Sequence, residues 1–263
     1  MKRTLIALFL LVGLTASAAF ASETFPFSVG ERLRFFIYAS KLYVGSQTVE
    51  LVGSEDLGGT GVYRIHGVSR SSFFLSIIYR LDDKWTVFID RDSLFPLKVE
   101  KDMTEGRAQG FFIYDIDQET GTVRIFDRNK NTTDVVQSEN LIFDLFSLLY
   151  YYRAHPEAFY EPYSFDFLEP HALHTVQFKD EGTVSIIIPR ISKKREVTAR
   201  KLRQIGGVGI EIYISDDSLR VPLKMTVPSL LPGGKKLLIE FYIDRFQPGG
   251  GITAPAQYRS LAY

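Results

Sequence analysis

Most of the chain beyond residue 30 alternates apolar and polar side chains with a period of two. Alternate residues of an extended strand point to opposite faces, so this period is typical of sheets with one buried face. Gly, Asp and Asn cluster in the intervening turns, where Gly supplies positive φ. The pattern predicts a mainly β fold. Strands are expected at residues 32–38, 47–52, 62–68, 79–89, 98–103, 110–116, 123–126, 174–178, 183–188, 195–202, 209–214, 223–227 and 236–242.

One segment follows a helical period instead. Five apolar residues between positions 140 and 153 recur at helical spacing, namely Leu141, Leu145, Leu148, Leu149 and Tyr152. Ser138 is a candidate N-cap, and Pro156 ends the helix because proline cannot continue it. We expect one central amphipathic helix over residues 140–153. It would pack on a sheet or fill the open side of a curved one.

A short motif occurs twice. Residues 92–98 read DSLFPLK, and residues 217–224 read DSLRVPLK with one residue inserted. Each copy follows an aromatic-rich strand and precedes another strand, and proline is tolerated where a strand begins. We interpret residues 22–247 as one β-rich domain with two related halves, about 22–137 and 170–247. A hairpin motif used twice by chance is the alternative, and residues 248–263 are expected to form a loose tail.

The N-terminus has the three parts of a secretory signal. Lys2 and Arg3 precede an apolar run over residues 5–14, and small residues surround Ala21. We predict a signal peptide over residues 1–21, cleaved between Ala21 and Ser22, with Ala18 as second choice. A retained anchor is the alternative, but the run is shorter than the roughly 20 residues that span a bilayer. The expected location is the periplasm of a bacterial envelope, with peripheral attachment to the outer membrane as a variant.

The amino-acid composition excludes several kinds of anchor and partner. The chain has no Cys, which excludes an acylated N-terminal anchor and disulfides, and no later segment is apolar enough for a transmembrane helix. Without Lys2 and Arg3, the 31 basic residues fall to 29 against 31 acidic ones. A nucleic-acid-binding domain usually has a marked basic excess, so we expect no nucleic-acid partner.

Four landmarks carry a family resemblance. They are Val29-Gly30-Glu31-Arg32-Leu33 with Gly45 downstream, the turn at 92–98, the 144–153 segment ending Tyr-Tyr-Tyr-Arg, and the turn at 217–224. In this order the chain resembles the bacterial envelope family called domain of unknown function 3108. That resemblance implies an antiparallel β fold and a periplasmic or outer-membrane-associated location, with no established activity.

A second resemblance concerns the strand, turn and Pro-Leu-Lys arrangement. It is similar to that of periplasmic lipoprotein carriers, whose curved half-barrel shelters acyl chains beneath a helical lid. This resemblance implies a curved antiparallel sheet or half-barrel here, and as a likeness of fold it bears only indirectly on function.

Residues 71–79 form the most suggestive apolar stretch, because both alternating faces are apolar and a strand there must be covered on both sides. The candidate apolar ligand lining is Phe73, Phe74, Ile77, Tyr79 and Trp85. A central core segment is the alternative.

A basic cluster at Lys193, Lys194 and Arg195 is a candidate contact for anionic lipid head groups. The alternative is an edge hairpin that its lysines keep from aggregating.

No catalytic, cofactor or metal residues are predicted. The chain lacks a Cys nucleophile and a G-x-S-x-G elbow. His171 and His174 have no third ligand spaced to complete a metal site. We therefore expect a non-enzymatic protein that binds a lipid-like or apolar ligand. The alternatives are a structural or assembly partner of another envelope protein, an outer-membrane β-barrel, and an enzyme of unfamiliar type.

Overall fold

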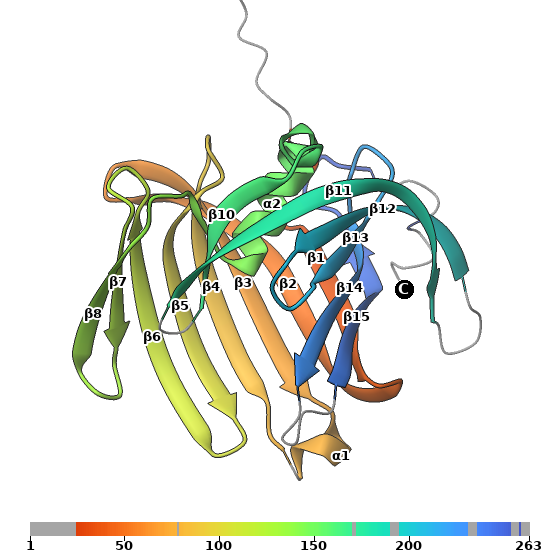
Figure 1. Cartoon of the computed structure of the whole chain (residues 1–263), viewed down its shortest axis with the longest axis horizontal. Helices are drawn as coiled ribbons and strands as arrows, with labels where there is room; N and C mark the ends of the chain where they lie inside the picture. Colours follow the sequence, from red (N-terminus) through yellow and green to blue (C-terminus); the bar gives the residue numbers. More distant parts are fainter. Residues whose placement is uncertain are drawn as a thin grey trace, which may run out of the picture.

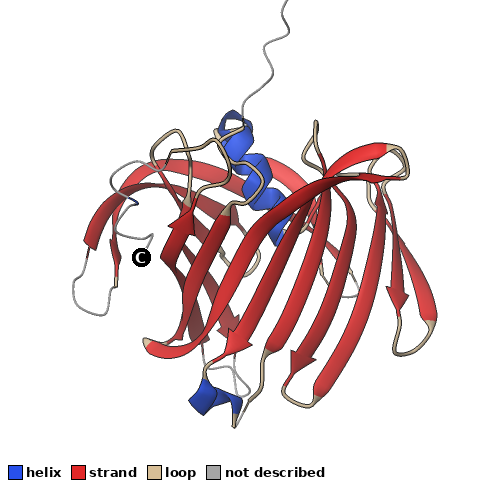
Figure 2. Cartoon of the chain, turned by 180° about the vertical axis from the view of Figure 1, so that it is seen from behind, coloured by secondary structure: helices blue, strands red, loops and turns tan. Residues whose placement is uncertain are grey.

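The chain folds into one open, strongly curved sheet, seen from opposite sides in Figure 1 and Figure 2. The computed structural model describes residues 25–77, 79–169, 172–189, 195–230, 236–253 and Tyr258. Its fifteen strands lie in the order β8-β7-β6-β5-β4-β3-β2-β1-β15-β14-β13-β12-β11-β10-β9. Neighbouring strands are antiparallel, except that β9 and β10 run parallel. The predictions of a mainly β chain and of a curved sheet are confirmed.

The strands of the first half follow one another as a meander. They are β1 (Arg32–Ala39), β2 (Leu42–Leu57), β3 (Thr60–Ser71), β4 (Asp82–Asp90), β5 (Pro96–Glu105), β6 (Ala108–Asp117), β7 (Thr122–Asp127) and β8 (Thr132–Gln137).

The chain then crosses to the other edge of the sheet and returns strand by strand to β1. This second half comprises β9 (Ile142–Phe143), α2 (Leu145–Ala154), η1 (Pro156–Phe159), β10 (Tyr163–Leu168), β11 (Leu173–Ile188), β12 (Arg195–Ile205), β13 (Glu211–Ser215), β14 (Pro222–Leu230) and β15 (Lys236–Gln247). Because β15 pairs with β1, the first and last strands lie together in the middle of the sheet.

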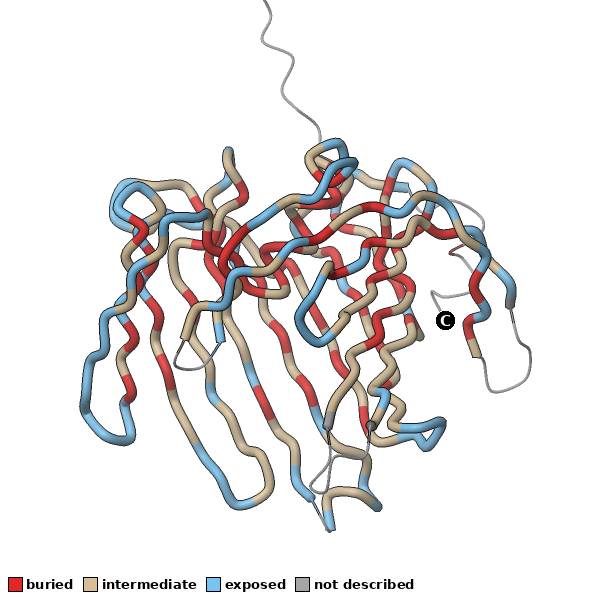
Figure 3. The backbone as a smooth tube through the Cα atoms, viewed as in Figure 1, coloured by how far each residue is buried: buried red, intermediate tan, exposed pale blue. Residues whose placement is uncertain are grey.

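The core lies on the concave face. Along β1, Leu33, Phe35 and Ile37 are buried, while the intervening side chains are partly or fully exposed, as the alternation predicts (Figure 3). Helix α2 lies between two apolar clusters. Phe146 and Tyr150 belong to the first cluster. Leu148 and Tyr152 belong to the second.

Helix α2 begins later than the periodicity indicated. Asp144 is its N-cap, since its Oδ1 accepts hydrogen bonds from the amides of Phe146 at 2.7 Å and Ser147 at 3.3 Å. The Ser147 hydroxyl accepts in return from the Asp144 amide at 3.0 Å, which completes a capping box. The prediction of Ser138 as N-cap is wrong, because its hydroxyl donates instead to Asp166 at 2.6 Å. No helix among the described parts of the chain is long and apolar enough to cross a membrane.

Residues 71–79 are not a strand. Phe73–Ser76 form a one-turn helix, α1, whose N-cap is the Ser72 hydroxyl. The apolar run therefore need not be covered on two faces. Strands β8, β9 and β10 were not anticipated, and the two strands expected at 174–178 and 183–188 are one continuous strand with an irregularity between Asp180 and Thr183.

Both copies of the repeated motif form the predicted strand, turn and proline-initiated strand. In the first, Asp90 Oδ1 accepts from the amides of residues 92 and 93, and β5 begins at Pro96. In the second, Asp217 Oδ1 accepts from the amides of residues 219 and 220, and β14 begins at Pro222. A relationship between the two complete halves stays a prediction.

A side chain in the first half of the sheet holds the edge strand β9. Gln118, in the β6–β7 turn, donates from Nε2 to the carbonyls of Pro96 at 3.1 Å and Ile142 at 2.9 Å. Its Oε1 accepts from the Ile142 amide at 3.1 Å. The single amide group thus joins β9 to the first half of the sheet.

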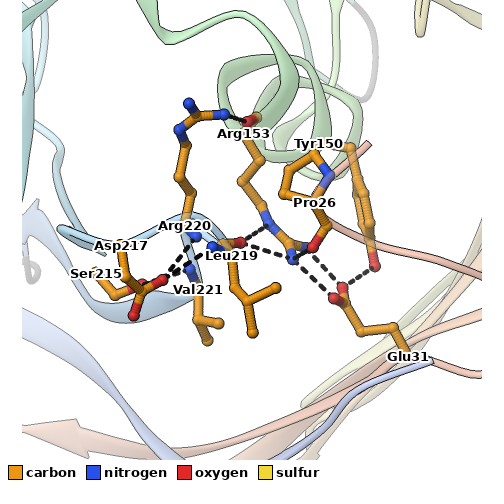
Figure 4. A network of polar contacts seen from close by, with 9 residues as sticks. All are labelled: Pro26, Glu31, Tyr150, Arg153, Ser215, Asp217, Leu219, Arg220 and Val221. Carbon is orange, nitrogen blue, oxygen red and sulfur yellow. Dashed lines mark hydrogen bonds and ion pairs between the residues drawn. The ribbon is translucent and has the colours of Figure 1, made fainter. Parts of the chain in front are cut away.

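A buried ion pair fixes α2 (Figure 4). Nη1 and Nη2 of Arg153 donate to the two carboxylate oxygens of Glu31 at 2.6 and 2.7 Å, and both side chains are fully buried. The Tyr150 hydroxyl also donates to Glu31, at 3.0 Å. The same guanidinium donates to the carbonyls of Leu219 and Pro26. Three of the four family landmarks, those containing Glu31, Arg153 and Leu219, therefore meet at one point.

The surroundings favour the charged form of Arg153. Burial alone lowers the pKa of Arg153, but the adjacent Glu31 carboxylate outweighs it and holds that pKa above its ordinary value. The guanidinium carbon also lies 5.2 Å from the ring centroids of both Phe27 and Tyr150.

The described part of residues 248–263 packs against the N-terminal segment. The Gly250 amide donates to the Val29 carbonyl at 3.0 Å, and the Ser28 hydroxyl donates to the Gly250 carbonyl at 2.9 Å. Tyr258 is buried, and its ring lies edge to face against the ring of Phe246, with the centroids 5.2 Å apart. Its hydroxyl donates a hydrogen bond to Asp217. The prediction of a loose tail is wrong for these residues.

Breaking the ion pair should destabilise the fold strongly. Arg153→Met leaves the Glu31 carboxylate buried without a countercharge, so we expect the free energy of unfolding in urea to fall by about 3–5 kcal/mol. The control is Glu50→Gln, which breaks an exposed 3.9 Å contact with Arg32 and should cost less than about 1 kcal/mol. Equal, small losses in the two variants would contradict the role given to Arg153.

Candidate functional site

The concave face of the sheet lines a partly open cavity of about 860 Å³. That volume falls within the roughly 300–1,000 Å³ typical of small-molecule sites. Strands from both halves contribute to its walls, together with α2. The lining is mainly apolar and includes Ile37, Val44, Trp85, Val87, Phe146 and Ile239.

Helix α2 closes one end of the cavity. The Phe146 ring projects from its first turn against Trp85, with the ring centroids 5.8 Å apart. Gly67 on β3 makes room for this ring, because a Cβ at that position would lie 2.8 Å from Phe146 Cζ. Since the Arg153–Glu31 pair holds the far end of α2, the helix has a fixed position at this end of the cavity. The other end reaches α1, where Leu75 and Tyr79 line it.

One wall carries a polar group of residues inside the apolar surroundings. Asp83 on β4 lies with Lys101 and Glu105 on β5, all three in the lining. Asp83 is only 3% exposed, its Oδ1 accepts from the Thr104 amide at 2.9 Å, and burial raises its pKa to about 6. Burial lowers the pKa of Lys101, although Asp83 and Glu105 act in the opposite direction. The Lys101 ammonium lies 5.8 Å from the Trp85 ring centroid.

Asp144 adds a further carboxyl group beside the cavity. Its Oδ1 caps α2, whereas within the described residues Oδ2 has no hydrogen-bond partner. Burial raises the pKa of Asp144, and the hydrogen bonds from the first turn of α2 oppose that rise. Across the described ranges, no group of three or more His, Asp or Glu side chains is arranged to hold a metal ion. The arrangement is suited to non-covalent binding of an apolar molecule that carries a polar end.

The predicted lining residues separate into two sets. Tyr79 and Trp85 line the cavity. Phe73, Phe74 and Ile77 lie in or beside α1 with 76, 81 and 73% of their surfaces exposed. Lys193 and Lys194 lie outside the described residues, as does the side chain of Arg195. The same holds for Ala21 and Ser22 at the predicted signal cleavage site. Ligand contact by any of these residues stays a prediction.

Sequence reasoning missed the polar group on β4 and β5. Its signal was present in the alternation: Asp83 shares the phase of Trp85 and Val87, and Lys101 shares the phase of Val99. A charged residue in the apolar phase of a strand indicates a special site. The β14 and β15 wall, with Val227 and Ile239, had no such local signal because its inward direction depends on the closure of the sheet.

The buried carboxyl of Asp83 should make stability depend on pH. Its pKa is higher in the folded chain than the value of about 4 of an unfolded chain, so stability falls as pH rises through about 6. Asp83→Asn keeps an oxygen for the Thr104 amide but cannot ionise. We expect the loss in free energy of unfolding between about pH 5 and about pH 8, measured in urea, to be smaller by about 1 kcal/mol in this variant.

Asp82→Asn is the matched control. Burial acts to raise the pKa of Asp82, but hydrogen bonds from Arg70 and Arg80 outweigh it and lower that pKa. The resulting stabilisation is complete above about pH 5 and is lost only at lower pH. This control should leave the difference between about pH 5 and about pH 8 unchanged, so equal effects of the two variants would contradict the assignment to Asp83.

Comparison with known proteins gives one family and one fold. A family model described as "Protein of unknown function (DUF3108)" matches residues 34–240. The chain is also similar to a crystal structure of a β-barrel-like protein of domain of unknown function DUF1849 from Brucella abortus. That likeness has a TM-score of 0.54 and 11% sequence identity, and covers 84% of this chain and 98% of the other. At such low identity it shows the fold alone. No curated protein matches the chain.

Proposed function

This chain belongs to the DUF3108 family of proteins of unknown function, and we propose that it binds a lipid-like ligand in its cavity without acting on it chemically. The observation that carries the proposal is an apolar cavity of about 860 Å³, bounded by α2 at one end. A chain that only needed a stable core would fill this space with its own side chains, because protein interiors are close-packed.

The lining favours an amphipathic ligand over a purely apolar one. An acyl chain or similar apolar body would lie along residues such as Ile37, Val87 and Ile239. A polar group of the ligand would lie near Asp83 and Lys101. The buried Asp83 carboxyl and the partly buried Lys101 ammonium could both form hydrogen bonds with such a group, which an apolar molecule cannot supply.

Filling the cavity should weaken ligand binding strongly. Val227 on β14 and Ile239 on β15 are directly paired neighbours on adjacent strands, and both line the cavity. We expect Val227→Trp with Ile239→Trp to weaken binding of the apolar fluorescent dye N-phenyl-1-naphthylamine by about tenfold or more, since the new rings occupy the ligand volume. Val135→Trp, at an exposed position on β8, is the control and should bind the dye normally.

Native mass spectrometry gives an independent outcome. After delipidation and incubation with a membrane lipid extract, the protein should carry lipid, and the cavity-filled variant should not. Absence of lipid together with copurification of one specific protein would instead favour the role of a structural or assembly partner.

For location, we propose export to the periplasm after removal of residues 1–21. The proposal is supported by the basic start, the apolar run and the small residues before Ser22. N-terminal sequencing of the protein recovered from a bacterial envelope fraction should read from Ser22. A sequence that begins at Met1 would contradict the proposed cleavage.

A further inference from the structure

Among the residues that the structure describes, the segment at α1 exposes large apolar side chains. None of the residues of α1 is buried. Phe73 and Phe74 contact each other edge to face at 5.8 Å, yet both rings remain more than three-quarters exposed. Contiguous exposed apolar surface of this kind marks an interaction site in a soluble protein.

This surface continues onto the neighbouring hairpin. The Ser72 amide donates to the Val44 carbonyl at 2.7 Å, which joins α1 to the start of β2. Leu42 and Tyr43, at that same start, are also exposed. We call the set the apolar rim, comprising Leu42, Tyr43, Phe73, Phe74 and Ile77.

The apolar rim borders the cavity. Val44 follows directly after Leu42 and Tyr43 in β2, and it lines the cavity. Leu75 and Tyr79 lie within and just after α1 and also line it. In Figure 1, α1 lies at the bottom, at the lower ends of the strands, whereas α2 lies near their upper ends. A molecule that covers the apolar rim therefore touches the end of the cavity that α2 does not close.

The described segments around the apolar rim hold more basic than acidic residues. Residues 40–43, the described part of 70–82, and 105–107 contain the basic Lys41, Arg70, Arg80 and Arg107 against the acidic Asp82 and Glu105, and the next residue, Asp83, is buried in the cavity wall. These segments are connected, since the Gly106 amide donates to the Arg80 carbonyl at 2.7 Å. The side chains of Arg70 and Arg80 are 64 and 63% exposed, and both pair with the one carboxylate of Asp82, at 3.2 and 3.3 Å, so the three groups together keep one positive charge.

We propose that the apolar rim docks on an anionic lipid bilayer, with Phe73, Phe74 and Ile77 inserted at the level of the head groups. Aromatic side chains favour that level, and insertion of an apolar face together with attraction of basic residues to anionic lipid is a known mode of peripheral binding. Docking in this way places the cavity end next to the membrane. The proposal concerns the outside of the fold and does not require an occupied cavity.

Vesicle co-sedimentation tests the proposal. The probes are vesicles of phosphatidylcholine alone and of phosphatidylcholine mixed with phosphatidylglycerol. We expect the protein to bind the mixed vesicles, more weakly at high salt because the charges are then screened. Phe73→Ser with Phe74→Ser should weaken that binding by about tenfold or more, since burial of each ring is lost.

Two controls make the result decisive. Val135→Ser removes an exposed apolar residue on β8, far from the rim, and should bind as the unchanged protein does. The cavity-filled Val227→Trp, Ile239→Trp variant should also bind vesicles normally, which separates this proposal from ligand binding. Circular dichroism checks that each variant is folded.

Three results would overturn the proposal. The first is no binding of the unchanged protein to mixed vesicles. The second is equal binding by the Phe73→Ser, Phe74→Ser variant. The third is a self-association that this variant abolishes while vesicle binding is absent, which would assign the apolar rim to a second copy of the chain.

Discussion

The Arg153–Glu31 ion pair is the contact on which the rest of the arrangement depends. It joins the segment before β1 to the last turn of α2, and the Leu219 carbonyl adds the β13–β14 turn to the same guanidinium. Each of these segments belongs to a different part of the chain. A charge buried here is tolerated only because both carboxylate oxygens of Glu31 and the carbonyls of Leu219 and Pro26 accept hydrogen bonds from the guanidinium. The pair therefore sets where α2 can lie, because no other position of the helix would pair these charges.

The position of α2 explains why this sheet contains a cavity. The curved sheet has more concave surface than one ten-residue helix can cover. Phe146 and Tyr150 fill the space near one end, and the Gln118 amide holds β9 across the same region. Toward α1 no comparable element among the described residues fills the interior, so inward side chains line a space rather than meeting a second layer. The cavity follows from the size of the sheet and the fixed place of its one long helix.

The polar groups around this space have a common physical meaning. Asp83 and Asp144 are buried and Lys101 is partly buried, and the pKa values of all three shift in the directions that burial causes. A buried polar or charged group lowers the stability of the fold unless a hydrogen-bond or charge partner compensates for the lost hydration. The proposed ligand with a polar end would pair with them inside the cavity, and the proposed docking of the apolar rim would bring the α1 end of the cavity to a bilayer. The two proposals thus use different residues but describe one route from a membrane surface to the interior.

Local patterns predicted much of the fold and little of the site. A period of two identified most strands, and the two Asp-capped turns before Pro96 and Pro222 were read correctly, because these features depend on neighbours in sequence. The start of α2 was misplaced and the 71–79 segment was taken for a strand, since capping by Asp144 and Ser72 outweighed apolar periodicity. Tyr79 and Trp85 were placed in the lining, but the opposite wall was not. By itself, the sequence determined a β chain of hairpins with one main helix. Only the tertiary structure decided the pairing of β1 with β15, the cavity and the pairing of Glu31 with Arg153, because these join residues more than a hundred positions apart and no local pattern records such distances.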